Sequence, residues 1–175
     1  FNREQEKIFK KCWIPLCHES ELVNHLDFRN SSIAGCKIAM IRDKEKIVSF
    51  QHSFQSMPVS GNLTEDGGYD HWNCPELHCE VKFGGMVWVT LNPEPTQDVE
   101  GWAAGAFDCI RPALDTEPLE VFHYHKAIIK SNYKLWHDTN SEFYHDYMHY
   151  FNRTTGFNEE YFARKCTGFD NGHVN

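Results

Sequence analysis

Short apolar runs separated by turn residues occupy positions 33–91, and this pattern does most to limit the fold. Residues 38–42 and 47–50 flank a charged tetrapeptide, which is the arrangement of a β-hairpin. Residues 81–91 read as two more strands, because a pair of adjacent glycines interrupts an apolar run. The turn-forming segment 92–95 follows them. We therefore expect a β-rich region in this part of the chain.

A second feature is the stretch 132–153, which lacks Gly and Pro and therefore allows a helix throughout. Four side chains in it recur at steps of four, three and four: Asp138, Glu142, His145 and His149. Residues at this spacing share one stripe of a helix. Two imidazoles and two carboxylates among large aromatic neighbours are costly to bury unless something pairs with them. We predict a helix over 138–152, with Thr139 or Ser141 as candidate N-caps.

Three metal chemistries are compatible with this stripe. A zinc protease helix uses His-Glu-x-x-His, but Asp146 stands at the second position here. A di-iron bundle needs two Glu-x-x-His motifs on facing helices. Residues 142–145 and 120–123 both have that form, although the second lies in a strand-like run. A mononuclear iron site needs only this helix and one distant acid, the facial triad. A histidine pair with a purely structural role stays open, since the chain holds 11 His.

Other segments carry weaker signals. Residues 2–11 predict a short charged helix, and residues 101–107 another. Residues 119–130 are rich in β-branched and aromatic side chains and predict a strand, with His123 and His125 on one face as core or pocket-lining groups. The His and Cys residues between 71 and 79 match no standard zinc-finger spacing and predict a loop.

Charge and cysteine content exclude several classes of protein. The net charge of −8 and the lack of a basic cluster argue against a nucleic-acid partner. A membrane span is not expected, because no run of about 20 apolar residues occurs. The seven cysteines are odd in number and scattered, which favours reduced thiols and a cytoplasmic location. The chain begins with Phe1 rather than Met, so we expect it to be part of a longer chain.

Three blocks of the sequence resemble the Rieske non-haem iron oxygenases, the ring-hydroxylating α subunits. Residues 132–135 followed by the stripe of acids and histidines resemble the family's iron-binding segment. Residues 1–22 are similar to its N-terminal lead-in, and residues 79–89 to the last strands of its Rieske domain. Within the family, the helix resembles that of methanesulfonate monooxygenase large subunits.

The resemblance implies an α+β fold in three parts. Residues 1–32 would form a helical lead-in, and residues 33–95 a β-rich Rieske-type domain. Residues 96–175 would begin a catalytic domain in which the iron-binding helix lies against an antiparallel sheet.

The resemblance also implies roles for residues of the helix. His145 and His149 match the two iron ligands, with a third ligand, an Asp, expected beyond Asn175. Glu142 matches the acid that accepts a hydrogen bond from a cluster-ligating His of the neighbouring subunit. Asp138 and Asn132 would support these groups from the same segment.

The sequence departs from the family at the Rieske cluster. A [2Fe–2S] cluster of this type needs Cys-x-His and Cys-x-x-His, and neither occurs anywhere in the chain. The segment 49–54 is similar to the region of the second motif, with Ser49 where Cys would stand and His52 as a candidate cluster ligand. Either the cluster has been lost or residues have been omitted. We expect an omission, visible as a break in the chain between Ser49 and Ser53.

The function implied by the resemblance is that of a terminal oxygenase. Such a component activates dioxygen at Fe²⁺ and hydroxylates a small organic substrate, here an aromatic acid or an alkylsulfonate. Its electrons would come from a reductase or ferredoxin, through a [2Fe–2S] cluster. The assembly would be a trimer-based homo- or hetero-oligomer, with or without a small β subunit. Two alternatives are a zinc-dependent hydrolase that uses His145 and His149, and a non-catalytic β-rich binding module.

Overall fold

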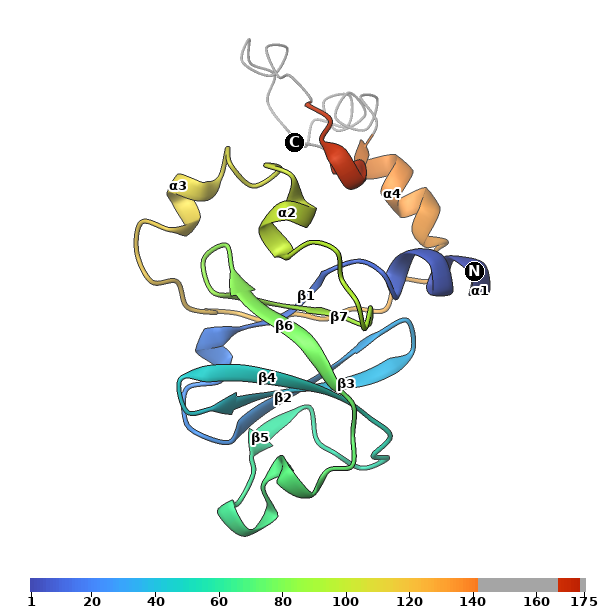
Figure 1. Ribbon diagram of the computed structural model, residues 1–175. Helices are drawn as coiled ribbons and strands as arrows, with labels where there is room; N and C mark the ends of the chain where they lie inside the picture. The colour runs from blue at the N-terminus through green and yellow to red at the C-terminus, as the bar shows by residue number, and fades with distance from the viewer. Residues whose placement is uncertain (142–166, 174–175) are drawn as a thin grey trace. The chain divides into compact units, whose positions relative to one another are not determined.

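A computed structural model describes residues 1–141 and 167–173 of the 175-residue chain (Figure 1). It divides into two compact units, Phe1–Phe122 with Gly168–Asn175, and His123–Thr167. The first unit is a sheet with a few short helices, so the predicted α+β class is confirmed. It extends to Phe122 and therefore takes in residues on both sides of the boundary predicted at 95/96.

The first unit is built on a seven-stranded antiparallel sheet with strand order β1-β7-β6-β4-β3-β2-β5. Its strands are β1 (Ile14–His18), β2 (Asp27–Ile33), β3 (Cys36–Asp43), β4 (Lys46–His52), β5 (Ser60–Asn62), β6 (Glu76–Lys82) and β7 (Met86–Thr90). The sheet thus begins before residue 33, where the β-rich region was predicted to start.

The predicted hairpin and the two strands predicted for residues 81–91 are confirmed, and both turns contain residues with left-handed backbone. β3 and β4 pair without interruption from Asp43↔Lys46 to Lys37↔His52, and Lys44 between them has φ +56°. β6 and β7 are joined by a turn with three successive positive φ values, the last being +93° at Gly85. Glycine adopts this conformation at no steric cost, which explains the glycine pair at this point.

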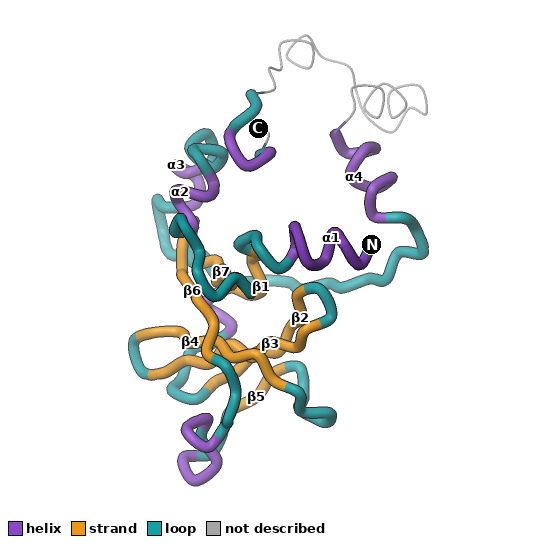
Figure 2. Tube along the Cα trace, turned by 45° about the vertical axis from the view of Figure 1, so that its right-hand side comes forward, coloured by secondary structure: helices purple, strands orange, loops and turns teal. Residues whose placement is uncertain are grey.

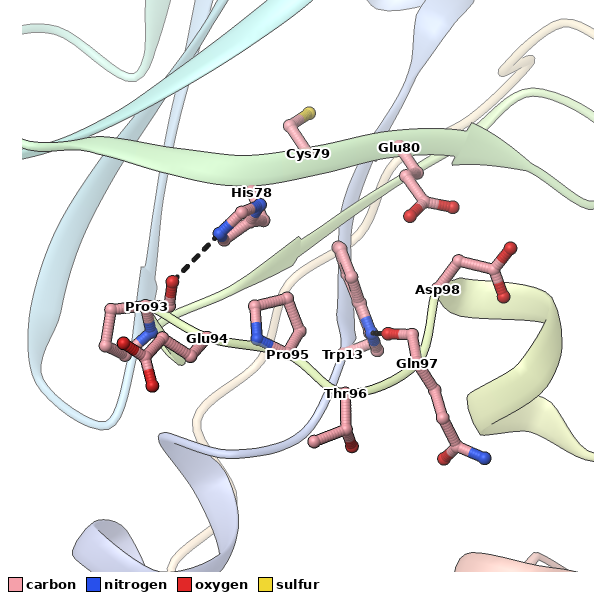
Figure 3. A pocket seen from close by; sticks show the side chains of 10 residues that line it. All are labelled: Trp13, His78, Cys79, Glu80, Pro93, Glu94, Pro95, Thr96, Gln97 and Asp98. Atoms are coloured by element: carbon pink, nitrogen blue, oxygen red, sulfur yellow. Dashed lines mark hydrogen bonds between the residues drawn. The ribbon is translucent and has the colours of Figure 1, made fainter.

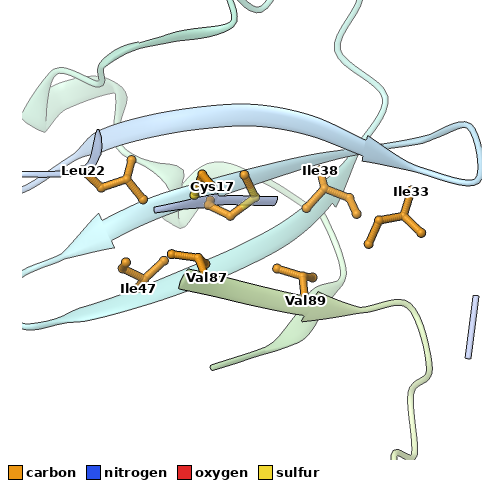
Figure 4. Packing of buried hydrophobic residues seen from close by; sticks show 8 residues of the cluster. Cys17, Leu22, Ile33, Ile38, Ile47, Val87 and Val89 are labelled. Atoms are coloured by element: carbon orange, nitrogen blue, oxygen red, sulfur yellow. The ribbon is translucent and has the colours of Figure 1, made fainter. Parts of the chain in front are cut away.

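Strand β6 joins the two halves of the sheet. Its first residues, Glu76 and Leu77, pair with β4, and residues 78–82 pair with β7 (Figure 2). The sheet therefore bends over itself, and apolar side chains from both halves meet inside (Figure 4). The buried members of this cluster are Cys17, Leu22, Ile33, Ile38, Met40, Ile47, Val87 and Val89.

Two further apolar clusters lie on the opposite faces of the same strands. On β7, Val87 and Val89 face the central cluster, whereas Trp88 between them packs with Trp13, Phe83 and helix α2. This is the two-residue alternation of a strand with both faces covered. The third cluster consists of Leu26, Phe28, Ile41, Val48 and Phe50, with Trp72, Tyr69 and other partly buried residues around it.

Helices are short in the part of the chain that the structure describes. They are α1 (Asn2–Glu4), η1 (Gln5–Phe9), η2 (Glu19–Glu21), η3 (Glu65–Gly67), η4 (Tyr69–His71), α2 (Val99–Ala103), α3 (Arg111–Leu114), α4 (Tyr133–Ser141) and η5 (Asp170–Gly172). The helix predicted for residues 2–11 is confirmed, and α2 overlaps the one predicted for 101–107. None of the described helices is long and apolar enough to cross a membrane.

Two expectations from the sequence are wrong. Residues 119–130 form no strand; His123 and His125 are exposed rather than core or pocket-lining. Strand propensity takes effect only where a neighbouring strand supplies hydrogen bonds and cover, and no described strand pairs with this segment. The expected break between Ser49 and Ser53 is also absent, because β4 runs through these positions to His52 in continuous register with β3.

Met40 offers a test of the central cluster. Its side chain is fully buried in β3, so Met40→Ala should lower the free energy of unfolding by about 2–5 kcal/mol through lost contacts and a residual cavity. Val23→Ala is the matched control, because Val23 is 73% exposed and should change stability by less than about 0.5 kcal/mol. Urea denaturation followed by tryptophan fluorescence measures both. Equal effects of the two substitutions would contradict the assignment of Met40 to the core.

Candidate functional site

Helix α4 begins the segment for which the sequence predicts iron binding. The Oδ1 atom of Asn132 accepts a hydrogen bond from the Lys134 amide at 3.0 Å, so Asn132 satisfies a free amide at the helix start. Thr139 does not cap the helix. It lies within α4, and its hydroxyl donates to the Leu135 carbonyl at 2.7 Å. Asn132 therefore fixes where the helix begins, a role that the sequence analysis gave to Thr139 or Ser141.

The predicted metal ligands follow this helix directly. Residues 138–141 of the predicted helix are helical, and Asp138 is an exposed residue of α4. Glu142, His145 and His149 lie outside the described residues, so their predicted convergence on one ion stays a prediction.

His52, the candidate cluster ligand, is buried at the end of β4 with both ring nitrogens occupied. Its Nδ1 accepts a hydrogen bond from the Phe54 amide at 3.2 Å, so Nε2 carries the proton and donates to Oδ1 of Asn30 at 3.1 Å. Burial, together with the nearby charge of Lys37, lowers the pKa of His52, which keeps the ring neutral. As folded, the ring presents no free nitrogen to a metal.

Asn30 links His52 to the connection that follows β4. Its Nδ2 donates to the carbonyl of Pro58, and its own amide donates to the Val59 carbonyl at 2.7 Å. The side chain of Lys37 donates to the Phe54 carbonyl at 2.8 Å. Residues 53–59 are thus held against β2 and β3 by hydrogen bonds at several points. No sequence pattern indicates this role of Asn30, because the role depends on the pairing of strands.

Asn30→Ala tests this arrangement. The substitution leaves the Nε2–H of a buried histidine without its acceptor, which should cost about 1–3 kcal/mol of stability. Asn62→Ala is the matched control: Asn62 also bonds through its side-chain amide, to the carbonyl of His25, but it is exposed on β5. Its loss should stay below about 1 kcal/mol. Equal urea midpoints for the two variants would show that the Asn30–His52 contact does not hold this end of the sheet.

A second buried histidine holds the β6–β7 turn. His18 Nε2 lies 2.5 Å from the Gly84 carbonyl, and its Nδ1 accepts from the Ser20 amide at 3.1 Å. The carboxylate of Glu21 accepts from the His18 amide and forms an ion pair with Arg29 at 3.2 Å, with both side chains about 15% exposed. These contacts connect β1, η2 and the glycine turn, so His18 has a structural role.

A shallow hollow of about 420 Å³ lies between β6 and the segment after β7 (Figure 3). Three of the side chains that line it are already paired with backbone groups. His78 Nε2 lies 3.1 Å from the Pro93 carbonyl, Trp13 Nε1 donates to the Gln97 carbonyl at 3.0 Å, and Glu80 accepts from the Val99 amide at 3.3 Å. Among the described residues no group of three or more His, Cys, Asp or Glu is placed to hold a metal ion.

Comparison with known proteins gives relatives of one kind. No family model matches the chain. The methanesulfonate monooxygenase hydroxylase α subunit of Methylosulfonomonas methylovora is 42% identical, over 99% of this chain and 52% of its own length. The 2-aminobenzenesulfonate 2,3-dioxygenase α subunit of Alcaligenes sp. is 27% identical, over 99% of this chain and 53% of its own length. The chain therefore spans about half the length of these relatives.

Solved structures share the fold. A quaternary ammonium Rieske monooxygenase, described in connection with carnitine oxidation and inter-subunit electron transfer, matches with a TM-score of 0.51 and 24% identity. That match covers 65% of this chain and 40% of the monooxygenase. The alignment with the methanesulfonate monooxygenase subunit is longer than this chain. It runs over 219 positions, whereas this chain has 175 residues, so at least 44 residues of the relative align with no residue here.

Proposed function

The chain belongs to the Rieske non-haem iron oxygenase α subunits, and from this membership we propose that its protein hydroxylates a small sulfonated organic molecule with dioxygen. The observation that carries the proposal is the match over 99% of the chain to two α subunits named for sulfonate substrates. One of these relatives is named for an alkylsulfonate and the other for an aromatic sulfonate. The sulfonate group is what the two substrates share, so we propose it as the recognised feature.

The iron would be held by His145 and His149. Their chemistry fits the metal, because two neutral imidazoles four residues apart on a helix, completed by one carboxylate, form a facial triad with open positions. When bound, Fe²⁺ supplies the activation of dioxygen. The third ligand is proposed to be an Asp outside this sequence. Glu142 is proposed as the acid that accepts a hydrogen bond from the neighbouring subunit.

The chain's own residues would position these ligands. Asn132 fixes the start of α4, so it also fixes the rotational setting of Asp138 and the other residues of that helix. Asp138 lies one turn before Glu142 and adds negative charge on the same stripe. We propose both as positioning residues.

The wider assembly belongs to the same proposal. We propose a reductase or ferredoxin as electron donor, a trimer-based oligomer and a cytoplasmic location. We also propose the three-part division at residues 32 and 95, with residues 96–175 as the beginning of a catalytic domain. The quaternary ammonium Rieske monooxygenase that shares the fold transfers electrons between subunits, which is consistent with an oligomer.

Turnover driven by hydrogen peroxide tests the proposal. Peroxide carries both the oxygen atom and the two electrons that hydroxylation needs, so the test requires no electron-donor protein. The protein loaded with Fe²⁺ should hydroxylate methanesulfonate or 2-aminobenzenesulfonate and leave carnitine unchanged. Chelation should abolish turnover, and Fe²⁺ but not Zn²⁺ should restore it. Hydrolytic activity restored by Zn²⁺ would favour the zinc hydrolase instead, and protein that binds no metal would favour the binding module.

A further inference from the structure

We propose that the β-rich unit of this chain folds without a [2Fe–2S] cluster, because contacts of its own close the end of the sheet at which the family's cluster would be bound. The inference concerns residues 1–122 and does not depend on the proposed iron chemistry of the histidine helix. Four observations support it: the missing ligand motifs, the state of the cysteines, the state of the histidines and the bonding of the connections between strands.

The ligands that a Rieske cluster requires are missing. Such a cluster needs two cysteines and two histidines, in Cys-x-His and Cys-x-x-His pairs. None of the seven cysteines has a histidine at either spacing. At the position that resembles the second motif stands Ser49, a fully buried residue of β4 whose hydroxyl donates to the Leu77 carbonyl at 3.2 Å. A serine bonded in this way across the β4–β6 pair belongs to the sheet and provides no thiolate.

The buried cysteines are poor candidates for cluster ligation. Iron–sulfur clusters bind thiolates, so ligation is favoured where the thiol loses its proton readily. Cys17 is buried in β1, and burial raises the pKa of its thiol far above the ordinary value. Burial also raises the pKa of Cys79 in β6 to about 12. The enclosure of these two side chains by the sheet thus disfavours the thiolate form that a cluster would bind.

The buried histidines are committed to other partners. His52 is bonded through Nδ1 to the Phe54 amide and through Nε2 to Asn30. His18 is bonded through Nε2 to the Gly84 carbonyl and through Nδ1 to Ser20. A cluster ligand needs one free nitrogen, so either residue would have to abandon a buried hydrogen bond. That exchange costs stability.

Aromatic side chains cover the end of β4. The ring of Phe54, in the connection after β4, stacks on His52 with centroids 5.2 Å apart. Trp72, in the connection before β6, meets Phe54 edge to face at 5.0 Å and Phe50 at 6.2 Å. Contacts of this kind stabilise a fold beyond the apolar area that they bury. The two connections are thus joined to each other where a cluster would otherwise hold them.

The relatives contain residues that this chain lacks, as expected if they have cluster-binding loops and this chain does not. The match to the methanesulfonate relative contains at least 44 positions without a counterpart here, and the match to the aminobenzenesulfonate relative at least 35. Two cluster loops would account for positions of this kind.

Acid-labile sulfide measures the cluster directly. The protein is produced with added iron and cysteine, purified anaerobically and treated with iron and sulfide under reconstituting conditions. The quaternary ammonium Rieske monooxygenase, treated in parallel, is the positive control. We expect less than about 0.1 labile sulfide per chain and no paramagnetic signal of a reduced cluster, against about two sulfides per chain in the control. Two sulfides per chain with that signal would overturn the proposal.

Stability gives a second readout. Trp72→Ala should lower the urea midpoint of the sulfide-free protein by about 1 M, because it removes the ring that joins the two connections. Trp136→Ala is the control: Trp136 is 56% exposed on α4, in the other compact unit, and should leave this transition unchanged. An unchanged midpoint in the Trp72 variant would show that the aromatic contacts do not close the sheet, and would contradict the proposal.

The two proposals fail in different ways. Protein without labile sulfide that still hydroxylates a sulfonate with peroxide supports both. Protein that lacks both sulfide and iron supports the cluster-free fold and contradicts the oxygenase. Protein with two sulfides contradicts the cluster-free fold whatever its activity.

Discussion

Gly85→Ala is expected to destabilise the first unit by about 3 kcal/mol or more, the largest effect we predict for a single methyl group. A Cβ atom at this position would lie 2.6 Å from Nε2 and 2.7 Å from Cε1 of His18. The ring would have to move and give up its bond to the Gly84 carbonyl, which costs about 1–3 kcal/mol. The φ of +93° adds backbone strain of about 1–2 kcal/mol for any residue with a Cβ.

Gly35→Ala separates these two contributions. Gly35 has a similar φ of +81°, but a Cβ atom there would meet nothing within 4 Å. This control should therefore lose only the backbone strain, about 1–2 kcal/mol. Urea denaturation of both variants gives the difference, which measures the contact with His18. Losses of equal size would mean that the histidine gives way freely and does not hold the β6–β7 turn.

The hairpins could be predicted from the sequence because their determinants are local. The β3–β4 hairpin needs two apolar strands and a short polar turn, all within residues 36–52. The β6–β7 hairpin needs residues that tolerate positive φ, and Gly84 and Gly85 indicate this directly. Such features depend on neighbours in the sequence, so the pattern of residues contains them.

Features that depend on distant partners could not be predicted in this way. Residues 119–130 have the composition of a strand, yet no described strand pairs with them, so they form no strand and are exposed. Asn30 lies in a polar part of β2, and only the pairing of β2 with β3 and of β3 with β4 brings it to His52. The start of α4 was missed for a simpler reason. Asn132 caps the helix seven residues, about two turns, before Thr139, the nearer of the two candidate caps that the sequence analysis favoured.

The sequence predicted the residue types and the family of the candidate site, but not the geometry of the site. Helical spacing selected the acids and histidines of one stripe, and the family resemblance gave them roles; relatives over 99% of the chain confirm the family. Geometry at Glu142, His145 and His149 stays a prediction. The missing cluster motif was visible in the sequence, but the contacts that replace it were not. Side chains from β2, β3 and β4 and from two connections form them together.

His145→Ala is expected to remove iron and turnover together. The methyl group of alanine cannot ligate Fe²⁺ in place of the imidazole. The remaining histidine and one carboxylate then leave the triad incomplete. Metal analysis after dialysis should find less than about a tenth of the wild-type iron, and peroxide-driven hydroxylation should fall in proportion. His137→Ala is the matched control, because His137 is exposed on α4 and lies off the stripe. Loss of iron in the control as well would indicate that the helix, rather than one ligand, has been disturbed.

Glu142→Gln is expected to separate iron binding from electron delivery. A carboxylate three residues before a ligand lies on the same stripe, close enough to accept a hydrogen bond from a neighbouring subunit while Fe²⁺ is held by other groups. Glutamine keeps the size and an acceptor oxygen but removes the charge. Iron content and peroxide-driven turnover should therefore stay near wild type. Turnover with whichever electron donor supports the wild-type protein should fall about 10–100-fold, as for other groups that orient a metal's ligands. If Glu142→Gln empties the site of iron as fully as His145→Ala does, Glu142 is itself a ligand and the proposed division of roles is wrong.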